Sequence, residues 1–151
     1  MAMHDGWTEA QRAQATRGCT VVVELGEGRD VVRVRGEIVA SEIDGDGLLL
    51  TVHVVDDVGT AALHSVDETC ADAATLLPPT LATLNRLAVE SFGEGASVKV
   101  KDSWTAGGVG TMPAFVTVTV PGKGFRTAEF VAHDVGDAAR ECARWLAARG
   151  R

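Results

Sequence analysis

The chain lacks tyrosine altogether, and aromatic residues make up only 5% of its 151 residues. A core of such a chain must therefore be built mostly from Val, Leu and Ala. No run approaches the roughly 18 apolar residues of a membrane span, and the N-terminal segment lacks the apolar stretch of a signal peptide. We therefore expect a protein without membrane contact and with a cytoplasmic location.

Cysteine is also scarce, because only Cys19, Cys70 and Cys142 occur and they are far apart. An odd number without a Cys-x-x-Cys pair fits neither a disulfide framework nor a zinc site. We interpret the three as reduced thiols that behave as small apolar residues.

Positive charge is in deficit, with a net charge of −7 and a pI near 5.0. An acidic surface repels phosphate backbones, so no nucleic-acid partner is expected. The length and the 46% hydrophobic content predict one globular domain. The excess of arginine over lysine, with abundant Ala, Val and Gly, is typical of a GC-rich bacterial source.

Residues 1–18 are polar and without periodicity, which predicts a flexible N-terminal arm or one short helix. A single α+β domain is expected over residues 19–151. Alternating apolar and polar residues predict strands at 20–25, 31–41, 48–56 and 60–66. Gly36 predicts a bulge or bend in the second of these, and Asp44-Gly45-Asp46-Gly47 predicts a hairpin turn.

Helix signals begin at Thr69, where Thr69 and Asp72 have the spacing of a capping box. Pro78 and Pro79 interrupt this helix, and a second helix is predicted from Pro79 to residue 92. Its apolar stripe consists of Leu81, Leu84, Leu87, Ala88 and Phe92.

The second half of the chain predicts strands at 98–104, 114–120 and 125–132, then a helix at 134–149 capped by Asp134. The buried stripe of that helix is predicted to be Val135, Ala138, Ala139, Cys142, Trp145 and Leu146. The resulting order is three or four strands, a broken helix, three strands and a helix. This order predicts a two-layer α+β fold, a mostly antiparallel sheet with two main helices packed on it.

The glycine-rich stretch 106–113, AGGVGTMP, invites comparison with a phosphate-binding loop. It lies between two predicted strands instead of opening a helix, and Pro113 lacks an amide donor. We interpret it as a mobile hairpin connection or, alternatively, as a contact loop for a partner or ligand. The candidate binding residues in and beside this stretch are Asp102, Trp104, Gly108, Thr111 and Met112.

Metal and catalytic sites are not predicted. His53 and His64 could meet across strands near Asp56 and Asp57, but this spacing is generic. The Asp44–Gly47 stretch is similar to the start of a calcium loop and lacks its later ligands. No Gly-x-Ser-x-Gly motif and no recognisable catalytic cysteine occur, and no cofactor is expected.

Three resemblances concern element order. The strand-strand-strand-helix unit occurs twice in the predicted order, and its second copy spans Val98 to Leu146. This repeated unit resembles the regulatory domain of 2-isopropylmalate synthase. The helix-βββ-helix order of residues 79–149 resembles a double-stranded-RNA-binding domain, but His133, Asp134 and Asp137 stand where that family places lysines. The stretch LATLNRLAVESFGEGASVKV is similar to small acidic secretion chaperones and YbjN-like proteins.

These features predict a non-catalytic cytoplasmic protein that binds another protein, in a chaperone, immunity or regulatory role, or forms a homodimer. The alternative is a small-molecule-binding regulatory domain with a pocket near Trp104 and residues 106–113. A third hypothesis is an enzyme that uses Asp102 or a histidine. The cheap observations that separate these hypotheses are the presence of a pocket and the identity of neighbouring genes.

Overall fold

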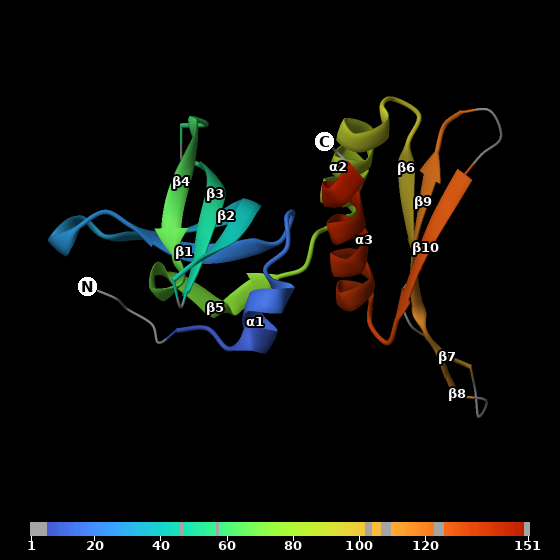
Figure 1. Ribbon diagram of the computed structural model, residues 1–151, viewed down its shortest axis with the longest axis horizontal. Helices are drawn as coiled ribbons and strands as arrows, with labels where there is room; N and C mark the ends of the chain where they lie inside the picture. The colour runs from blue at the N-terminus through green and yellow to red at the C-terminus, as the bar shows by residue number, and fades with distance from the viewer. Residues whose placement is uncertain are drawn as a thin grey trace. The chain divides into compact units, whose positions relative to one another are not determined.

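The computed structural model describes residues 6–45, 47–56, 58–101, 104–106, 110–122 and 126–149, without the side chains of 104–106 and 110–112. Figure 1 shows antiparallel sheets and helices, so the predicted α+β class is confirmed. The contacts divide the chain into two compact units, Met1–Leu77 and Pro78–Arg151. Each unit has its own sheet and its own hydrophobic core.

The first unit is built around a five-stranded antiparallel sheet of order β4-β3-β2-β1-β5. Its strands are β1 (Thr20–Leu25), β2 (Val32–Asp44), β3 (Gly47–Val55), β4 (Ala61–Asp67) and β5 (Ala71–Leu77). Helix α1 (Glu9–Gln14) precedes the sheet, and the short 3-10 helices η1 (Gly28–Asp30) and η2 (Glu68–Cys70) precede β2 and β5. The short helix α1 corresponds to one of the two alternatives predicted for residues 1–18.

Alternation along the strands places the apolar residues on one face, as the sequence predicts. On β3, Leu48, Leu50, Val52 and Val54 are buried, and the residues between them are half-buried. Gly36 faces this layer, where an added Cβ would overlap the side chain of Val52. The shift of register in β2 lies two residues later, between Ile38 and Ala40. Gly36 is therefore needed for close packing, and the predicted bulge lies further along the strand.

The prediction of a helix that begins at Thr69 is wrong. Residues 68–70 form η2, the Asp67 carboxylate accepts a hydrogen bond from Thr69 N at 3.0 Å, and residues 71–77 form β5. β5 pairs with β1 and completes the sheet around the buried Ala71. This non-local pairing outweighs the local capping pattern, which marks the turn before a strand instead of a helix start.

The second unit contains a three-stranded antiparallel sheet of order β10-β9-β6 and a separate two-stranded ribbon, β7-β8. The strands are β6 (Ser97–Lys101), β7 (Trp104–Ala106), β8 (Gly110–Met112), β9 (Ala114–Val120) and β10 (Arg126–Ala132). Helices α2 (Leu81–Phe92) and α3 (Val135–Arg149) lie on one face of the three-stranded sheet (Figure 1). Both helices stand where the sequence predicts them, and Asp134 Oδ1 accepts the predicted capping bond from Asp137 N at 2.9 Å.

The core of the second unit lies between the two helices and the sheet. Its fully buried members include Leu84, Val116, Val118, Ala138 and Cys142. Burial raises the pKa of the Cys142 thiol to about 12, so this thiol stays protonated at neutral pH. This agrees with its interpretation as a small apolar residue.

The predicted stripes need corrections at their ends, where Phe92 and Val135 are half-buried. Leu81 is 48% exposed, so the buried stripe of α2 begins one turn later, at Leu84. Trp145 is half-buried at the margin of the core, with its ring centroid 5.4 Å from that of Phe92 and 5.7 Å from that of Phe130. In the part of the chain that the structure describes, none of the helices is long and apolar enough to cross a membrane.

Candidate functional site

The predicted binding residues belong to the ribbon β7-β8 or to its connections. Its backbone pairs Trp104 with Met112 and Thr105 with Thr111, so Gly110–Met112, part of the predicted connection, is itself a strand. Asp102 and Gly108 lie outside the described residues, as do the side chains of Trp104, Thr111 and Met112. Whether these five residues bind anything stays a prediction.

The two histidines that could have shared a metal point to opposite faces of the first sheet. His53 pairs with the exposed Leu63, whereas His64 pairs with the buried Val52. Asp56 is engaged in a turn, where its Oδ1 accepts hydrogen bonds from Val58 N at 3.0 Å and from Thr60 N at 2.8 Å. The described residues contain no cluster of three or more His, Cys, Asp or Glu suited to a metal ion.

The turn after β2 also has a structural explanation. Asp44 pairs with Gly47 across a two-residue loop, and Gly45 adopts a φ of +64°. A positive φ is typical of the hairpin turns that glycine favours. The stretch that is similar to a calcium loop is therefore the predicted hairpin.

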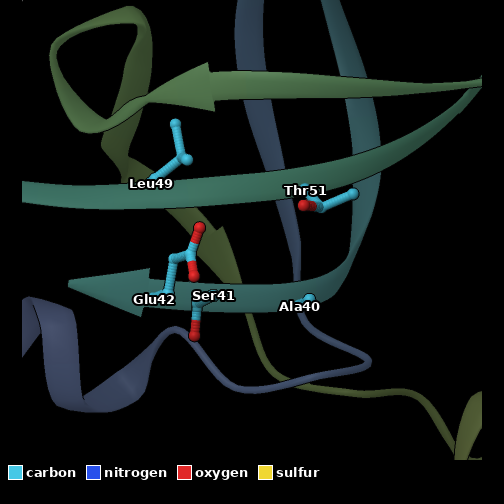
Figure 2. A pocket seen from close by; sticks show the side chains of 5 residues that line it. All are labelled: Ala40, Ser41, Glu42, Leu49 and Thr51. Atoms are coloured by element: carbon cyan, nitrogen blue, oxygen red, sulfur yellow. The ribbon is translucent and has the colours of Figure 1, made fainter. Parts of the chain in front are cut away.

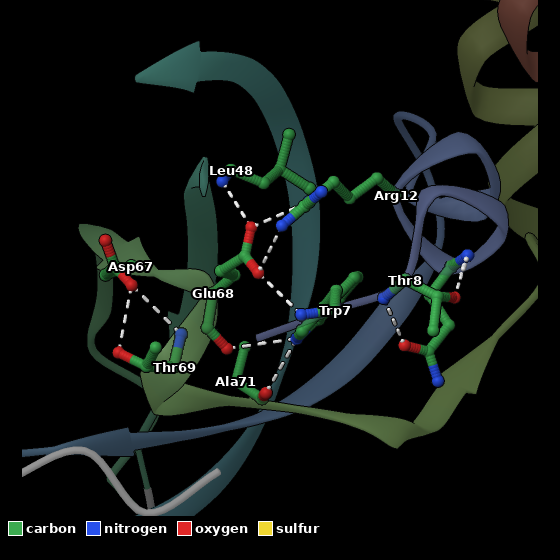
Figure 3. A network of polar contacts seen from close by, with 9 residues as sticks. Trp7, Thr8, Arg12, Leu48, Asp67, Glu68, Thr69 and Ala71 are labelled. Atoms are coloured by element: carbon green, nitrogen blue, oxygen red, sulfur yellow. Dashed lines mark hydrogen bonds and ion pairs between the residues drawn. The ribbon is translucent and has the colours of Figure 1, made fainter. Parts of the chain in front are cut away.

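Glu68 is the most deeply buried acidic residue that the structure describes, with 2% of its surface exposed. Figure 3 shows its carboxylate at the centre of a polar network. It accepts hydrogen bonds from Trp7 N and Leu48 N, each at 2.5 Å, and from Arg12 Nε and Nη2 at 2.9 and 3.0 Å. The Trp7 indole N–H donates to the carbonyls of Glu68 and Ala71, both at 3.0 Å.

This network holds the N-terminal segment against the first sheet. The hydrogen bonds from Arg12, and then those from Trp7 and Leu48, lower the pKa of Glu68 against the opposing effect of burial. The carboxylate is thus ionised and fully engaged, which suits a structural role better than proton transfer. The sequence pattern does not reveal Glu68. Its one signal is Trp7, a large apolar residue in an otherwise polar stretch, which is typical of an anchored segment.

A shallow hollow of about 200 Å³ lies on β2 and β3 of the first unit (Figure 2). Its lining consists of Ala40, Ser41, Glu42, Leu49 and Thr51. Pockets that enclose small ligands usually have volumes of about 300–1,000 Å³ and mostly apolar walls. This hollow is smaller and partly polar, so it gives little support to a small-molecule site.

The second unit presents a different kind of surface, which we call the open face. It is the face of the three-stranded sheet opposite the helices, because the alternate residues of these strands are buried beneath α2 and α3. Its members are Ser97, Lys99 and Lys101 of β6, Phe115, Thr117 and Thr119 of β9, and Thr127, Glu129 and Val131 of β10.

Strand register arranges the open face in three rows. The central row is Lys99–Thr117–Glu129, so charges of opposite sign flank a threonine. They lie on opposite sides of β9, two strand spacings or about 9–10 Å apart. Both residues are exposed, and neither side chain forms an ion pair or hydrogen bond with another residue that the structure describes.

The neighbouring rows are apolar on one side and hydroxyl-bearing on the other. One row is Lys101–Phe115–Val131, in which Phe115 is half-buried and Val131 is 46% exposed. The other is Ser97–Thr119–Thr127. The open face therefore combines apolar area, hydroxyl groups and a separated pair of opposite charges.

One lateral edge of this sheet is partly covered. The Asn85 side chain of α2 accepts a hydrogen bond from Val98 N at 2.8 Å and donates to Val98 O at 3.5 Å. These bonds occupy the outward backbone groups of β6 at Val98, where an added strand would otherwise pair. A partner of this sheet is thus more favourably bound on the face of the sheet than at the β6 edge.

Comparisons of the chain with models of protein families, with curated proteins and with solved structures found no match. A functional assignment therefore depends on the residues and the geometry of the two units.

Proposed function

We propose that this chain is a non-catalytic protein-binding module that binds its partner through the open face. The observation that carries the proposal is the one-sided covering of the three-stranded sheet by α2 and α3. An antiparallel sheet can leave one face to solvent, but a solvated face is usually strongly polar. Here that face carries Phe115 and Val131 beside threonines.

Six of the nine side chains of the open face lose little freedom on contact, which favours binding. Thr, Val and Phe have few rotatable bonds, so ordering them at an interface costs less than ordering long side chains. Lys99 and Glu129 add opposite charges at two sides of the face, and such charges orient a partner and exclude wrongly charged ones. A chaperone, immunity or regulatory role and a cytoplasmic location both fit such a module and belong to this proposal.

The small-molecule alternative has less support. The hollow in the first unit measures about 200 Å³, and the side chains near Trp104 lie outside the described residues. We therefore propose protein binding and leave the alternative as a prediction.

Site-specific photo-crosslinking in cells that produce the full chain tests the proposal. A photoreactive residue at position 117, in the centre of the open face, should yield a protein adduct of one defined mass. The same residue at position 141, exposed on α3, is the control and should not. The adduct at 117 should also weaken when Lys99 is changed to Glu. Equal yields at both positions, or no adduct at 117, would refute the open face as a binding surface.

A further inference from the structure

We infer that the open face binds a second copy of this chain, in a two-fold dimer that stacks the two open faces. This inference rests on the proposed function and identifies its partner. The charges of the central row support it, because their arrangement across the sheet is complementary to itself under one symmetry operation.

The relevant two-fold axis runs parallel to the strands, midway between the two faces and over β9. Such an axis places β9 over β9 of the second copy, and β6 over its β10. Lys99 then faces Glu129 of the other copy, and Glu129 faces Lys99, while Thr117 lies over its own counterpart. The two charges that form no ion pair within the described part of one chain thus form two ion pairs between chains.

The alternative symmetric arrangements place like charges together. An axis perpendicular to the strands would put Lys99 over Lys99 and Glu129 over Glu129. Antiparallel pairing of two β10 edges about the middle of Arg126–Ala132 would set Glu129 opposite itself. Like charges placed directly opposite each other are destabilising. The charge pattern therefore selects the face-to-face dimer with parallel strand directions.

The rows beside the charges support the same arrangement. Phe115 would meet Phe115, and Val131 would meet the aliphatic part of Lys101. With nine side chains from each copy, the contact is smaller than the 20–30 residues per partner of a standard interface. We therefore expect a weak dimer whose population rises with concentration through the micromolar range.

Sedimentation velocity of the full chain over a wide concentration range tests the dimer by charge exchange. Lys99→Glu and Glu129→Lys should each weaken the dimer on the order of 10-fold or more, because each creates two like-charge contacts. The double variant should return to within about 3-fold of the original Kd, because both ion pairs are restored in reversed sense. Glu141→Lys on α3 is the matched control and should leave the Kd unchanged. Thermal unfolding by circular dichroism verifies that each variant is folded.

Chemical crosslinking gives a second measurement of the dimer, which depends on the position of the proposed two-fold axis. A cysteine at position 117 should join two chains through a short bis-maleimide, because this position lies beside its own counterpart. A cysteine at position 141 should not. The original chain, in which Cys19 and Cys142 are buried and Cys70 is partly exposed, sets the background.

The failure of the dimer and the failure of the proposed function give different results. A chain that stays monomeric at every concentration, or single variants without effect, would overturn the dimer. So would a double variant that fails to restore it. If position 117 then photo-crosslinks a different protein, the open face is a binding surface and only the second copy is wrong. If position 117 forms no adduct either, both proposals fail.

Discussion

Glu68 shows how a single side chain can join segments that are distant in sequence. Its buried carboxylate receives four hydrogen bonds, from Trp7, Leu48 and both donating nitrogens of Arg12. A buried carboxylate is tolerated only when such donors replace its water. The neighbourhood is therefore stable while the group is ionised, and Trp7 is buried as a consequence.

Glu68→Gln is expected to lower the free energy of unfolding of the first unit by about 3 kcal/mol at pH 7. The pKa of Glu68 lies below its ordinary value of 4.5 in the folded chain. Its contribution is therefore complete above about pH 4.5 and is lost as the pH falls through the lowered folded pKa. Urea unfolding between pH 8 and pH 3 measures the difference in free energy of unfolding between the original chain and the variant. This difference should be constant from pH 8 to about pH 4.5 and should decrease at lower pH.

The matched control for that experiment is Glu90→Gln. Glu90 pairs with Arg86 on the surface of α2 at 3.2 Å, with both side chains nearly half exposed. An exposed pair of this kind contributes about 0–1 kcal/mol. If Glu68→Gln lowers the free energy of unfolding by no more than Glu90→Gln does, or by an amount that does not depend on pH, the charge of Glu68 adds nothing to stability.

At the scale of elements, α2 does more than cover the core. Its Asn85 side chain also forms hydrogen bonds with the outward backbone groups of Val98, and so covers part of the edge of β6. Helix and strand thus share one polar contact beside their apolar packing. The contact disfavours the addition of a strand at this edge.

Asn85→Ala should destabilise the second unit by about 1–3 kcal/mol, because the N–H and C=O of Val98 lose their side-chain partner. Alanine favours a helix more than asparagine does, so a loss would appear despite improved helix propensity. Chemical denaturation followed by circular dichroism measures the effect, with Glu90→Ala on the same helix as control. An unchanged midpoint for Asn85→Ala would mean that water replaces the side chain without cost.

At the scale of the whole molecule, each of the two cores uses residues of its own unit alone. The first core extends from Trp7 to Ala71, and the second from Leu84 to Leu146. The sequence predicts a single domain over residues 19–151. Separate cores instead favour two units that can unfold independently.

The fragments 1–77 and 78–151 are therefore each expected to unfold cooperatively in urea. Trp7 is the only tryptophan of the first fragment, so its fluorescence reports that unit. Glu68→Gln should affect only the first fragment. Trp145→Ala should affect only the second, by about 2–4 kcal/mol, since its ring contacts Phe92 and Phe130. A fragment without a cooperative transition would instead support the single domain.

Local sequence patterns were sufficient to predict much of the secondary structure of the second unit. The alternation along residues 114–120 and the helical stripes of α2 and α3 depend on contacts that each element repeats along its own length. The capping role of Asp134 is local as well, because its partner Asp137 is three residues away. Features of this kind can be predicted from one sequence, and they are confirmed here.

The sequence by itself determined the α+β class, most strand faces, the hairpin at Asp44–Gly47 and both main helices, because neighbouring residues encode these features. Only the tertiary structure decided that residues 71–77 form β5, since that strand depends on pairing with β1. It also decided the anchoring of Trp7 by Glu68, across 61 residues of chain. The open face likewise exists only because three strands align Lys99, Thr117 and Glu129 in one row. Contacts between distant segments leave no periodicity in the sequence, so pattern alone cannot reveal them.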